Sequence, residues 1–120
     1  MKNRLLLLLL ALAIPAAFLT ALAAPPREEQ WKQVDEAVKK GLPKTAIERL
    51  GPIIEGALKD KAYAEAIRAI GRKIALEGNI QGNKPEEKIT RMQAEIAKAP
   101  AEMKPAMHAI MAHWYWQYFQ

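Results

Sequence analysis

Cysteine is absent from the 120-residue chain, which excludes disulfide bonds, thiolate metal sites and a thiol nucleophile. Its absence also excludes lipid attachment at a lipobox cysteine. Residues 24–120 contain no serine, and their only threonines, Thr45 and Thr90, fall at solvated helical positions without a neighbouring base. Nucleophilic catalysis therefore has no candidate residue, and we expect the protein not to be an enzyme.

Concentrated positive charge is also lacking. The full chain has a formal net charge of +5, and Lys2 and Arg4 account for two of the basic residues. The longest basic runs in the remainder are the pairs Lys39-Lys40 and Arg72-Lys73. Nucleic-acid binding needs a stripe of basic residues along the phosphates. We therefore expect no nucleic-acid partner.

Patterns for metal and phosphate binding are incomplete. The two histidines, His108 and His113, are five residues apart, which places them about 140° apart around a helix. They cannot share a metal ion as an i, i+4 pair would. The segment from Gly78 to Lys84 has one residue too few between its glycines for a phosphate-binding loop, and Pro85 follows it. We expect a turn there, and no metal or cofactor.

The first 23 residues have the features of a secretory signal peptide. Lys2 and Arg4 precede six leucines, and the apolar run closes on Ala21-Leu22-Ala23. A charged start, an apolar middle and small residues before the cut are typical of such peptides. We predict cleavage between Ala23 and Ala24, and a periplasmic or extracellular location. An uncleaved membrane anchor over residues 5–22 is the alternative, and the small-residue exit argues against it.

Residues 24–120 form one predicted domain of 97 residues. Apolar residues recur there at helical spacing, and no stretch alternates long enough for a strand. The sequence predicts an all-α fold of about five helices in antiparallel, tetratricopeptide-like hairpins. The predicted helices span residues 27–40, 44–59, 62–77, 85–99 and 101–120, with a loop over 78–84.

Two local features refine the predicted helices and their packing, and each predicted helix also has an apolar face.

Gly51-Pro52 predicts a kink or a short break near Arg49. Ala46-Ile47 and Ala66-Ile67 recur at a spacing of 20, which indicates similar hairpin packing. The predicted core positions of the first four helices are Trp31, Val34, Val38, Ile47, Leu50, Ile54, Ala57, Leu58, Tyr63, Ala66, Ile67, Ile70, Ile74, Ile89, Met92 and Ile96.

The last helix is apolar on more than one face. A second stripe, which includes Tyr115 and Phe119, lies about 100° from the predicted core face, and Trp116 points further away. Such a helix is ordinarily buried between two layers. We therefore predict that Tyr115, Trp116 and Phe119 form an interdomain interface. The predicted core face comprises Met103, Met107, Ile110, Met111, Trp114 and Tyr118.

The aromatic ending at Gln120 lacks a helix cap and a polar tail. We therefore expect the chain to be the N-terminal part of a longer protein. The alternative is a complete small protein whose aromatic end forms a homodimer.

Three segments resemble one architecture: Trp31-Lys-Gln-Val34, Gly41-Leu-Pro-Lys-Thr-Ala46 and Ala109-Ile-Met-Ala-His-Trp-Tyr-Trp-Gln-Tyr118. The chain resembles the N-terminal helical region of large bacterial α2-macroglobulin-like proteins. The resemblance implies an exported peptidase inhibitor in which β-sandwich domains follow this helical module and supply the trapping chemistry. The family's thioester and bait region have no counterpart here, so no active residue carries over.

The resemblance implies that the module's partners are downstream domains of the same protein, with peptidases engaged only through the full-length inhibitor. The alternative is a stand-alone, tetratricopeptide-like adaptor of the periplasm that binds peptides or proteins.

Overall fold

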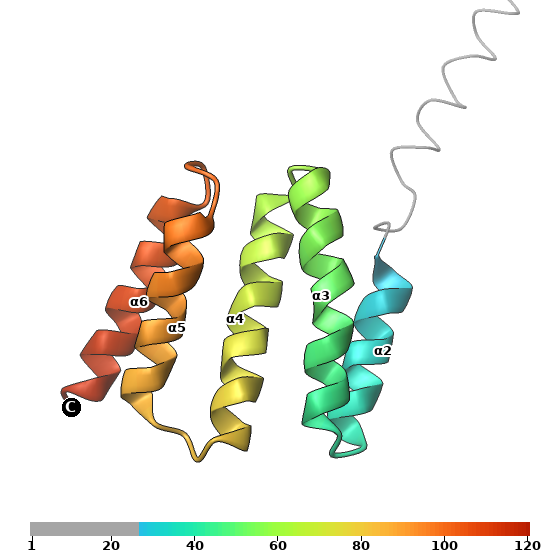
Figure 1. The fold of residues 1–120 in the computed structure, drawn as a ribbon, viewed down its shortest axis with the longest axis horizontal. Coiled ribbons are helices and arrows are strands. Elements are labelled where there is room, and N and C mark those ends of the chain that lie inside the picture. Colours follow the sequence, from blue (N-terminus) through green and yellow to red (C-terminus); the bar gives the residue numbers. More distant parts are fainter. Residues whose placement is uncertain (1–26) are drawn as a thin grey trace, which may run out of the picture.

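The computed structural model describes residues 27–120, and this part of the chain contains five α-helices and no strand. The predicted all-α class is therefore confirmed. Successive helices run in opposite directions and pack mainly on their neighbours in sequence, which produces an open array (Figure 1). The helices are α2 (Glu28–Lys39), α3 (Pro43–Lys59), α4 (Tyr63–Ile80), α5 (Pro85–Lys98) and α6 (Lys104–Tyr118).

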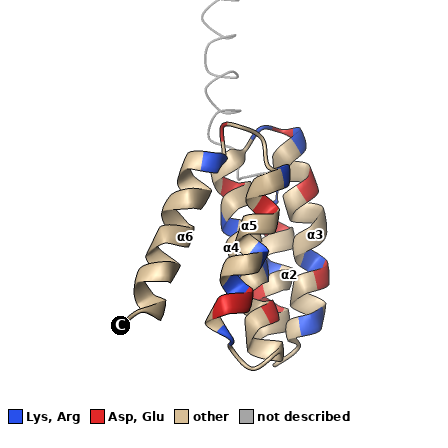
Figure 2. Ribbon diagram, turned by 60° about the vertical axis from the view of Figure 1, so that its left-hand side comes forward, with Lys and Arg blue, Asp and Glu red and all other residues tan. Residues whose placement is uncertain are grey.

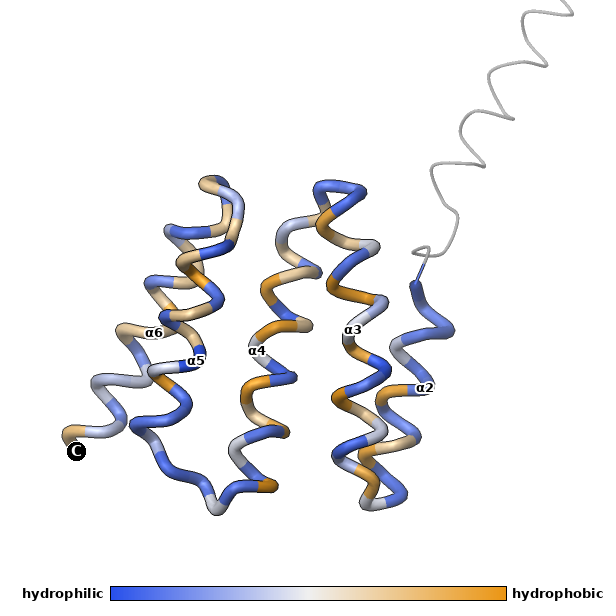
Figure 3. Tube along the Cα trace, in the orientation of Figure 1, coloured by the Kyte–Doolittle hydropathy of each residue, from blue (hydrophilic) through white to orange (hydrophobic). Residues whose placement is uncertain are grey.

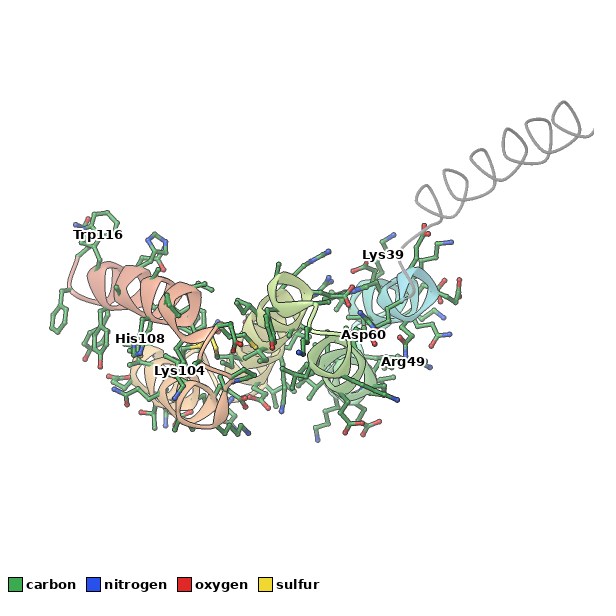
Figure 4. All side chains as sticks on the ribbon, turned by 90° about the horizontal axis from the view of Figure 1, so that it is seen from above. Lys39, Arg49, Asp60, Lys104, His108 and Trp116 are labelled. Carbon is green, nitrogen blue, oxygen red and sulfur yellow. The ribbon has the colours of Figure 1, made fainter. Side chains whose placement is uncertain are left out.

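Seen end-on, the helices alternate between two rows, with α2, α4 and α6 in one row and α3 and α5 in the other (Figure 4). Within residues 27–120 no helix combines the length and the apolar character needed to cross a bilayer. The predicted signal peptide and its cleavage site between Ala23 and Ala24 lie outside the described residues.

The first two hairpins close with the same backbone turn. After α2, Gly41 adopts a left-handed φ of 69°, and the Leu42 N–H donates to the Ala37 carbonyl at 2.9 Å. After α3, Lys61 adopts φ 55°, and the Ala62 N–H donates to the Ala57 carbonyl at 2.8 Å. These bonds satisfy carbonyls that the helix end leaves free. The turn therefore recurs at the 20-residue spacing seen in the sequence.

Helix α4 is longer than the sequence predicted. The predicted loop over 78–84 is wrong in its first three residues, because α4 continues to Ile80. Glycine weakens a helix by only about 1 kcal/mol, so Gly78 alone does not end one that is packed against its neighbours. The turn comes where Gly82 and Asn83 have positive φ, and the Asn83 N–H donates to the Gly78 carbonyl at 2.8 Å.

Helix α3 continues through Pro52, so the predicted break near Arg49 is wrong. Pro52 lies on the exposed side of α3, while the next residue, Ile53, is fully buried. The ring removes one backbone hydrogen bond, and water can satisfy the carbonyl that loses its donor on that exposed side. Burial of Ile53 and Leu50 holds the remaining turns together.

Helix α6 is shorter than predicted at both ends. Residues 101–103 form a turn, in which the Met103 N–H donates to the Pro100 carbonyl at 3.0 Å, and the helix begins at Lys104. It ends at Tyr118, before Phe119 and Gln120. Proline cannot donate within a helix, and it pushes the residue before it towards extended backbone, which separates α5 from α6 at Pro100.

The buried side chains of the described residues form two clusters that share α3 and α4. Figure 3 shows the strongly apolar residues concentrated on these central helices. Helix α4 directs Ala69 and Leu76 to one cluster and Ile70 and Ile74 to the other. The first cluster comprises Trp31, Val34, Ala37, Ala46, Leu50, Ile53, Ala69 and Leu76, and the second comprises Ala57, Ala66, Ile70, Ile74, Met92, Ile96, Met103 and Met107.

The predicted core is correct for most positions and wrong for two. Val38 is 37% exposed, and the neighbouring Ala37 is buried in its place. The small side chain of Ala37 lets α2 approach α3 closely. The sequence-based prediction missed this position because it favoured large apolar residues at helical spacing. Tyr118 is 42% exposed instead of buried. Some predicted core positions are only partly buried but pack against the clusters, and Ile54 contacts both. These positions are Ile47, Ile54, Leu58, Tyr63, Ile67, Ile110, Met111 and Trp114.

Candidate functional site

The candidate site is the outer face of α6, which we define as His108, Ala112, Tyr115, Trp116 and Phe119. All five residues are exposed, and the exposed fractions of Tyr115, Trp116 and Phe119 are 37%, 60% and 78%. In Figure 4 the Trp116 side chain projects from α6 away from the other helices. The interface role predicted for these three aromatic residues remains a prediction.

Two aromatic contacts order this face. His113 stacks on Trp116 with ring centroids 6.2 Å apart, and Phe119 meets Tyr118 edge-on at 5.0 Å. Both contacts join neighbours on α6 or at its end, so they leave the outer surfaces of the rings in water. Stacked and edge-to-face pairs are favourable geometries for aromatic rings. The face is therefore partly ordered before any partner binds.

Charge is nearly absent from α6. Lys104 is the only Lys, Arg, Asp or Glu in this helix, and the rest of α6 is tan in Figure 2. The other helices carry both signs of charge on their exposed sides. A solvated helix usually has a polar outer face, so the outer face of α6 departs from the rest of the array.

The opposite side of α6 packs on the array. Met107 and Met103, just before the helix, are fully buried, whereas Ile110, Met111 and Trp114 pack only partly against the same cluster. Burial therefore declines from the start of α6 to its end. The first turn is firmly anchored, and the last turns depend on contacts at the surface.

Three polar contacts tie the end of α6 to α5. The Tyr118 hydroxyl donates to Glu86 Oε1 at 3.1 Å, and Gln93 Nε2 donates to the Tyr115 hydroxyl at 3.3 Å. The Lys88 ammonium lies 4.3 Å from the centroid of the Trp114 ring, which is a cation–π distance. The hydrogen bond to Glu86, with the negative charge of that carboxylate, raises the pKa of Tyr118 above its ordinary value of 10.0.

A groove of about 300 Å³ lies between α4 and α6, and residues at the start of α5 and in the turn before it also line it. Its lining includes Asn79, Lys84, Lys88, Trp114 and Gln117. We call it the α4–α6 groove. It shares no residue with the outer face of α6, so the two surfaces are separate candidates.

A second polar cluster lies at the opposite end of the array, and the sequence did not reveal it. The Arg27 side chain is buried, donates to Asp60 Oδ2 at 2.7 Å and also donates to Glu65. Trp31 Nε1 donates to the other oxygen of Glu65 at 3.4 Å. Hydrogen bonds to Asp60 and Glu65 raise the pKa of the Arg27 guanidinium, which keeps it charged.

This cluster fastens the start of α2 to the end of α3, through Asp60, and to the first turn of α4, through Glu65. A Cβ added at Gly56 would lie 3.1 Å from Arg27 Nη1, so the glycine leaves room for the guanidinium. Each of its hydrogen bonds joins residues that are more than 30 positions apart in sequence. The only signal available in the sequence was a lone arginine directly after two prolines, which does not identify its partners.

The remaining sequence candidates stay apart. His108 lies on the exposed side of α6, and His113 stacks on Trp116. Residues 27–120 hold no group of three metal-ligating side chains. Gly78 is part of α4, so the segment up to Lys84 is not a continuous phosphate-type loop.

Comparison with known proteins gives no further identification. The chain matches no family, no curated protein and no solved structure. Function must therefore be argued from the surfaces described above.

Proposed function

We propose that this chain is a non-catalytic helical interaction module of an exported protein, and that the outer face of α6 is its docking surface. The observation that carries the proposal is the exposure of Tyr115, Trp116 and Phe119 at the end of a helix whose only charged residue is Lys104. Burying a large apolar side chain gains roughly 1.5–3 kcal/mol, so a partner that covers all three would gain substantial affinity. Contiguous apolar surface of this kind marks interaction sites on soluble proteins.

The contrast within α6 supports this role. Met107 on the inner side is fully buried and anchors the helix to the array, whereas the outer face adds a surface contact, the hydrogen bond from Gln93 Nε2 to the Tyr115 hydroxyl. Tyrosine and tryptophan are enriched where interfaces are most strongly bound, because they combine apolar area with a polar group. The outer face is thus available for a partner at little cost to the fold.

The proposed setting is an α2-macroglobulin-like inhibitor, and it rests on the sequence resemblance of the three segments given above. In that setting the outer face of α6 packs against domains that follow Gln120, and those domains trap the peptidase. The coding sequence beyond Gln120 tests the setting. Many hundreds of further residues rich in short strands would support an α2-macroglobulin-like setting, whereas an immediate stop codon would refute it.

The alternative is a stand-alone adaptor built from tetratricopeptide-like hairpins. Regular hairpin packing supports a helical adaptor, because Ala37 and Ala57 accept equivalent bonds and Ala46 and Ala66 are equally buried. The 34-residue period of tetratricopeptide repeats is not visible in the sequence. The adaptor would use the same outer face to bind a separate protein.

The docking role is tested with the double variant Tyr115→Ala/Phe119→Ala of the purified protein. We expect binding of a hydrophobic dye to fall, because the variant removes two of the three exposed rings of the outer face, including Phe119, which is 78% exposed. The Tm should stay within about 3 °C of the parent value, since neither ring is buried. Dye fluorescence and thermal unfolding by circular dichroism provide the two measurements.

The matched control is Met107→Ala, on the buried side of the same helix. Loss of a buried methionine costs about 2–5 kcal/mol, so its Tm should fall by roughly 10 °C or more. An equal fall in the double variant would mean that the outer face is internal core, and the docking role would be refuted.

A further inference from the structure

The α4–α6 groove has charge of one sign. Its lining contains Lys84 and Lys88 and no carboxylate. The comparable groove between α3 and α5, of about 340 Å³, is lined by two lysines and two glutamates and is therefore balanced. A bound group that complements the α4–α6 groove must accordingly be negative.

Lys88 is the better placed of the two cations. Within the described residues it has no ion-pair partner, and its ammonium lies over the Trp114 ring. Lys84, in contrast, is paired with Glu87 at 3.8 Å. An ammonium held over an indole keeps hydrogens free for a second, stronger acceptor. Lys88 is thus positioned to receive a carboxylate at the groove.

Amide and aromatic side chains supply the rest of the lining. Asn79, Asn83 and Gln117 each offer both a donor and an acceptor, which matches the alternating N–H and C=O groups of an extended peptide. Trp114 supplies a flat apolar surface beside them. The volume is at the small end for ligand sites, so it suits a few residues of peptide and not a folded domain.

We propose that the α4–α6 groove binds a short, extended acidic peptide segment. A carboxylate of the segment pairs with Lys88, its backbone bonds to Asn79 and Gln117, and an apolar side chain lies beside Trp114, against the part of the ring that Lys88 does not cover. This proposal does not depend on docking at the outer face of α6, because the two surfaces share no residue. A neutral sugar would also suit amides and an indole, but it would leave the lysine charge uncompensated.

The probe is the acetylated and amidated peptide Glu-Leu-Glu-Leu-Glu, and the control peptide carries Gln in place of each Glu. Binding to the purified protein is followed by NMR through the side-chain amides of Asn79 and Gln117 and the indole N–H of Trp114. We expect these signals to shift first and the acidic peptide to bind about tenfold more tightly than its neutral counterpart, because a charge-assisted hydrogen bond is replaced by a neutral one.

Two variants separate the groove from general positive charge. Lys88→Gln should weaken binding of the acidic peptide about five- to tenfold and bring it close to the neutral peptide. Lys73→Gln, which removes a lysine from the α3–α5 groove, should change binding less than twofold. Asn79 is exposed, and Asn79→Ala should weaken binding of the acidic and the neutral peptide equally. This variant tests the groove while leaving Lys88 in place.

Three results would overturn the proposal. These are equal affinity for the acidic and neutral peptides, an equal effect of Lys88→Gln and Lys73→Gln, and tighter binding of inorganic phosphate or a neutral oligosaccharide than of the acidic peptide. If the Tm of a lysine variant falls by more than about 5 °C, Asn79→Ala is used in its place. Unchanged peptide binding by Asn79→Ala would also refute the proposal.

Discussion

The two ends of the helical array are fastened in different ways. Between α2 and α4, Arg72 pairs with Asp35 at 2.7 Å, and Arg68 lies 4.3 Å from the centroid of the Trp31 ring. Between α4 and α6 the corresponding space is the open α4–α6 groove. The N-terminal end of the array is therefore closed by charged and aromatic contacts, whereas the C-terminal end leaves its groove open.

The packing of side chains follows the same contrast. Small buried residues such as Ala37, Ala46 and Ala57 let α2, α3 and α4 approach one another. Beyond Met107, by contrast, α6 holds no fully buried side chain. Elements with little burial open most readily, and binding surfaces are commonly drawn from them. The comparison supports stability at one end of the array and interaction at the other.

The largest expected effect is in the first hydrophobic cluster, which contains Leu50. Leu50→Ala removes a fully buried side chain between α2, α3 and α4 and should lower the free energy of unfolding by about 3 kcal/mol. Trp116→Ala, at the other end, should change it by less than about 0.5 kcal/mol, because the ring is exposed. Urea unfolding measures both. A loss above about 1 kcal/mol for Trp116→Ala would contradict the proposed difference.

The Arg27 cluster should have the next largest effect. Arg27→Ala leaves Glu65, which is mostly buried, without its cation, and should lower the Tm by roughly 5–10 °C. Arg27→Lys keeps the charge, but its single ammonium replaces the two guanidinium nitrogens that bind Glu65 and Asp60. We therefore expect it to recover only part of the lost Tm. Lys32→Ala is the control, because Lys32 forms only an exposed pair with Glu29. A Tm for Arg27→Ala as high as that of the control would show that the cluster does not fasten α2.

Two helical glycines test the space around Arg27 more finely. Gly71→Ala meets no atom within 4 Å and should stabilise α4 by about 1 kcal/mol through helix propensity. Gly56→Ala should raise the free energy of unfolding by less than half as much, because its Cβ would lie 3.1 Å from Nη1 of the Arg27 guanidinium, which its ion pairs hold in place. In the Arg27→Ala background the two substitutions should become equivalent. Urea unfolding of the four variants measures this coupling, and equal gains with Arg27 present would refute the steric role of Gly56.

Local sequence signals predicted the elements better than the contacts between them. Pro85, Glu86 and Glu87 set the start of α5, and Gly41 sets the end of α2, so these boundaries could be read from the chain. The continuation of α3 through Pro52 could not, because it depends on burial of Ile53 against other helices.

The candidate surfaces divide in the same way. The aromatic stripe of α6 follows from its periodicity, which the sequence contains. The α4–α6 groove joins residues of three helices and one turn, and the Arg27 cluster joins side chains of α4 and two chain segments outside the helices. Such sites need the packing angles between helices, which periodicity does not supply.

The smallest expected effect concerns the last turn of α6 in alkali. The Glu86 carboxylate accepts the Tyr118 hydrogen bond, so folding favours the protonated phenol and raises its pKa above 10.0. The stabilisation is therefore fully present below pH 10.0 and is lost as the pH rises through the higher pKa of the folded state. Arg27 keeps its charge over this range, so the Arg27 cluster should persist while the end of α6 loosens.

Glu86→Gln tests this difference directly. The glutamine still accepts a hydrogen bond but carries no charge, so the pKa of Tyr118 should fall towards 10.0. The ring-carbon NMR signal of Tyr118, followed through an alkaline titration, measures the change. The indole signal of Trp31, which donates to Glu65, reports on the Arg27 cluster in the same spectra. An unchanged Tyr118 titration in Glu86→Gln would mean that the contact is absent in solution. A Trp31 signal that moved together with Tyr118 would mean that the two ends open as one unit, which would remove the distinction between them.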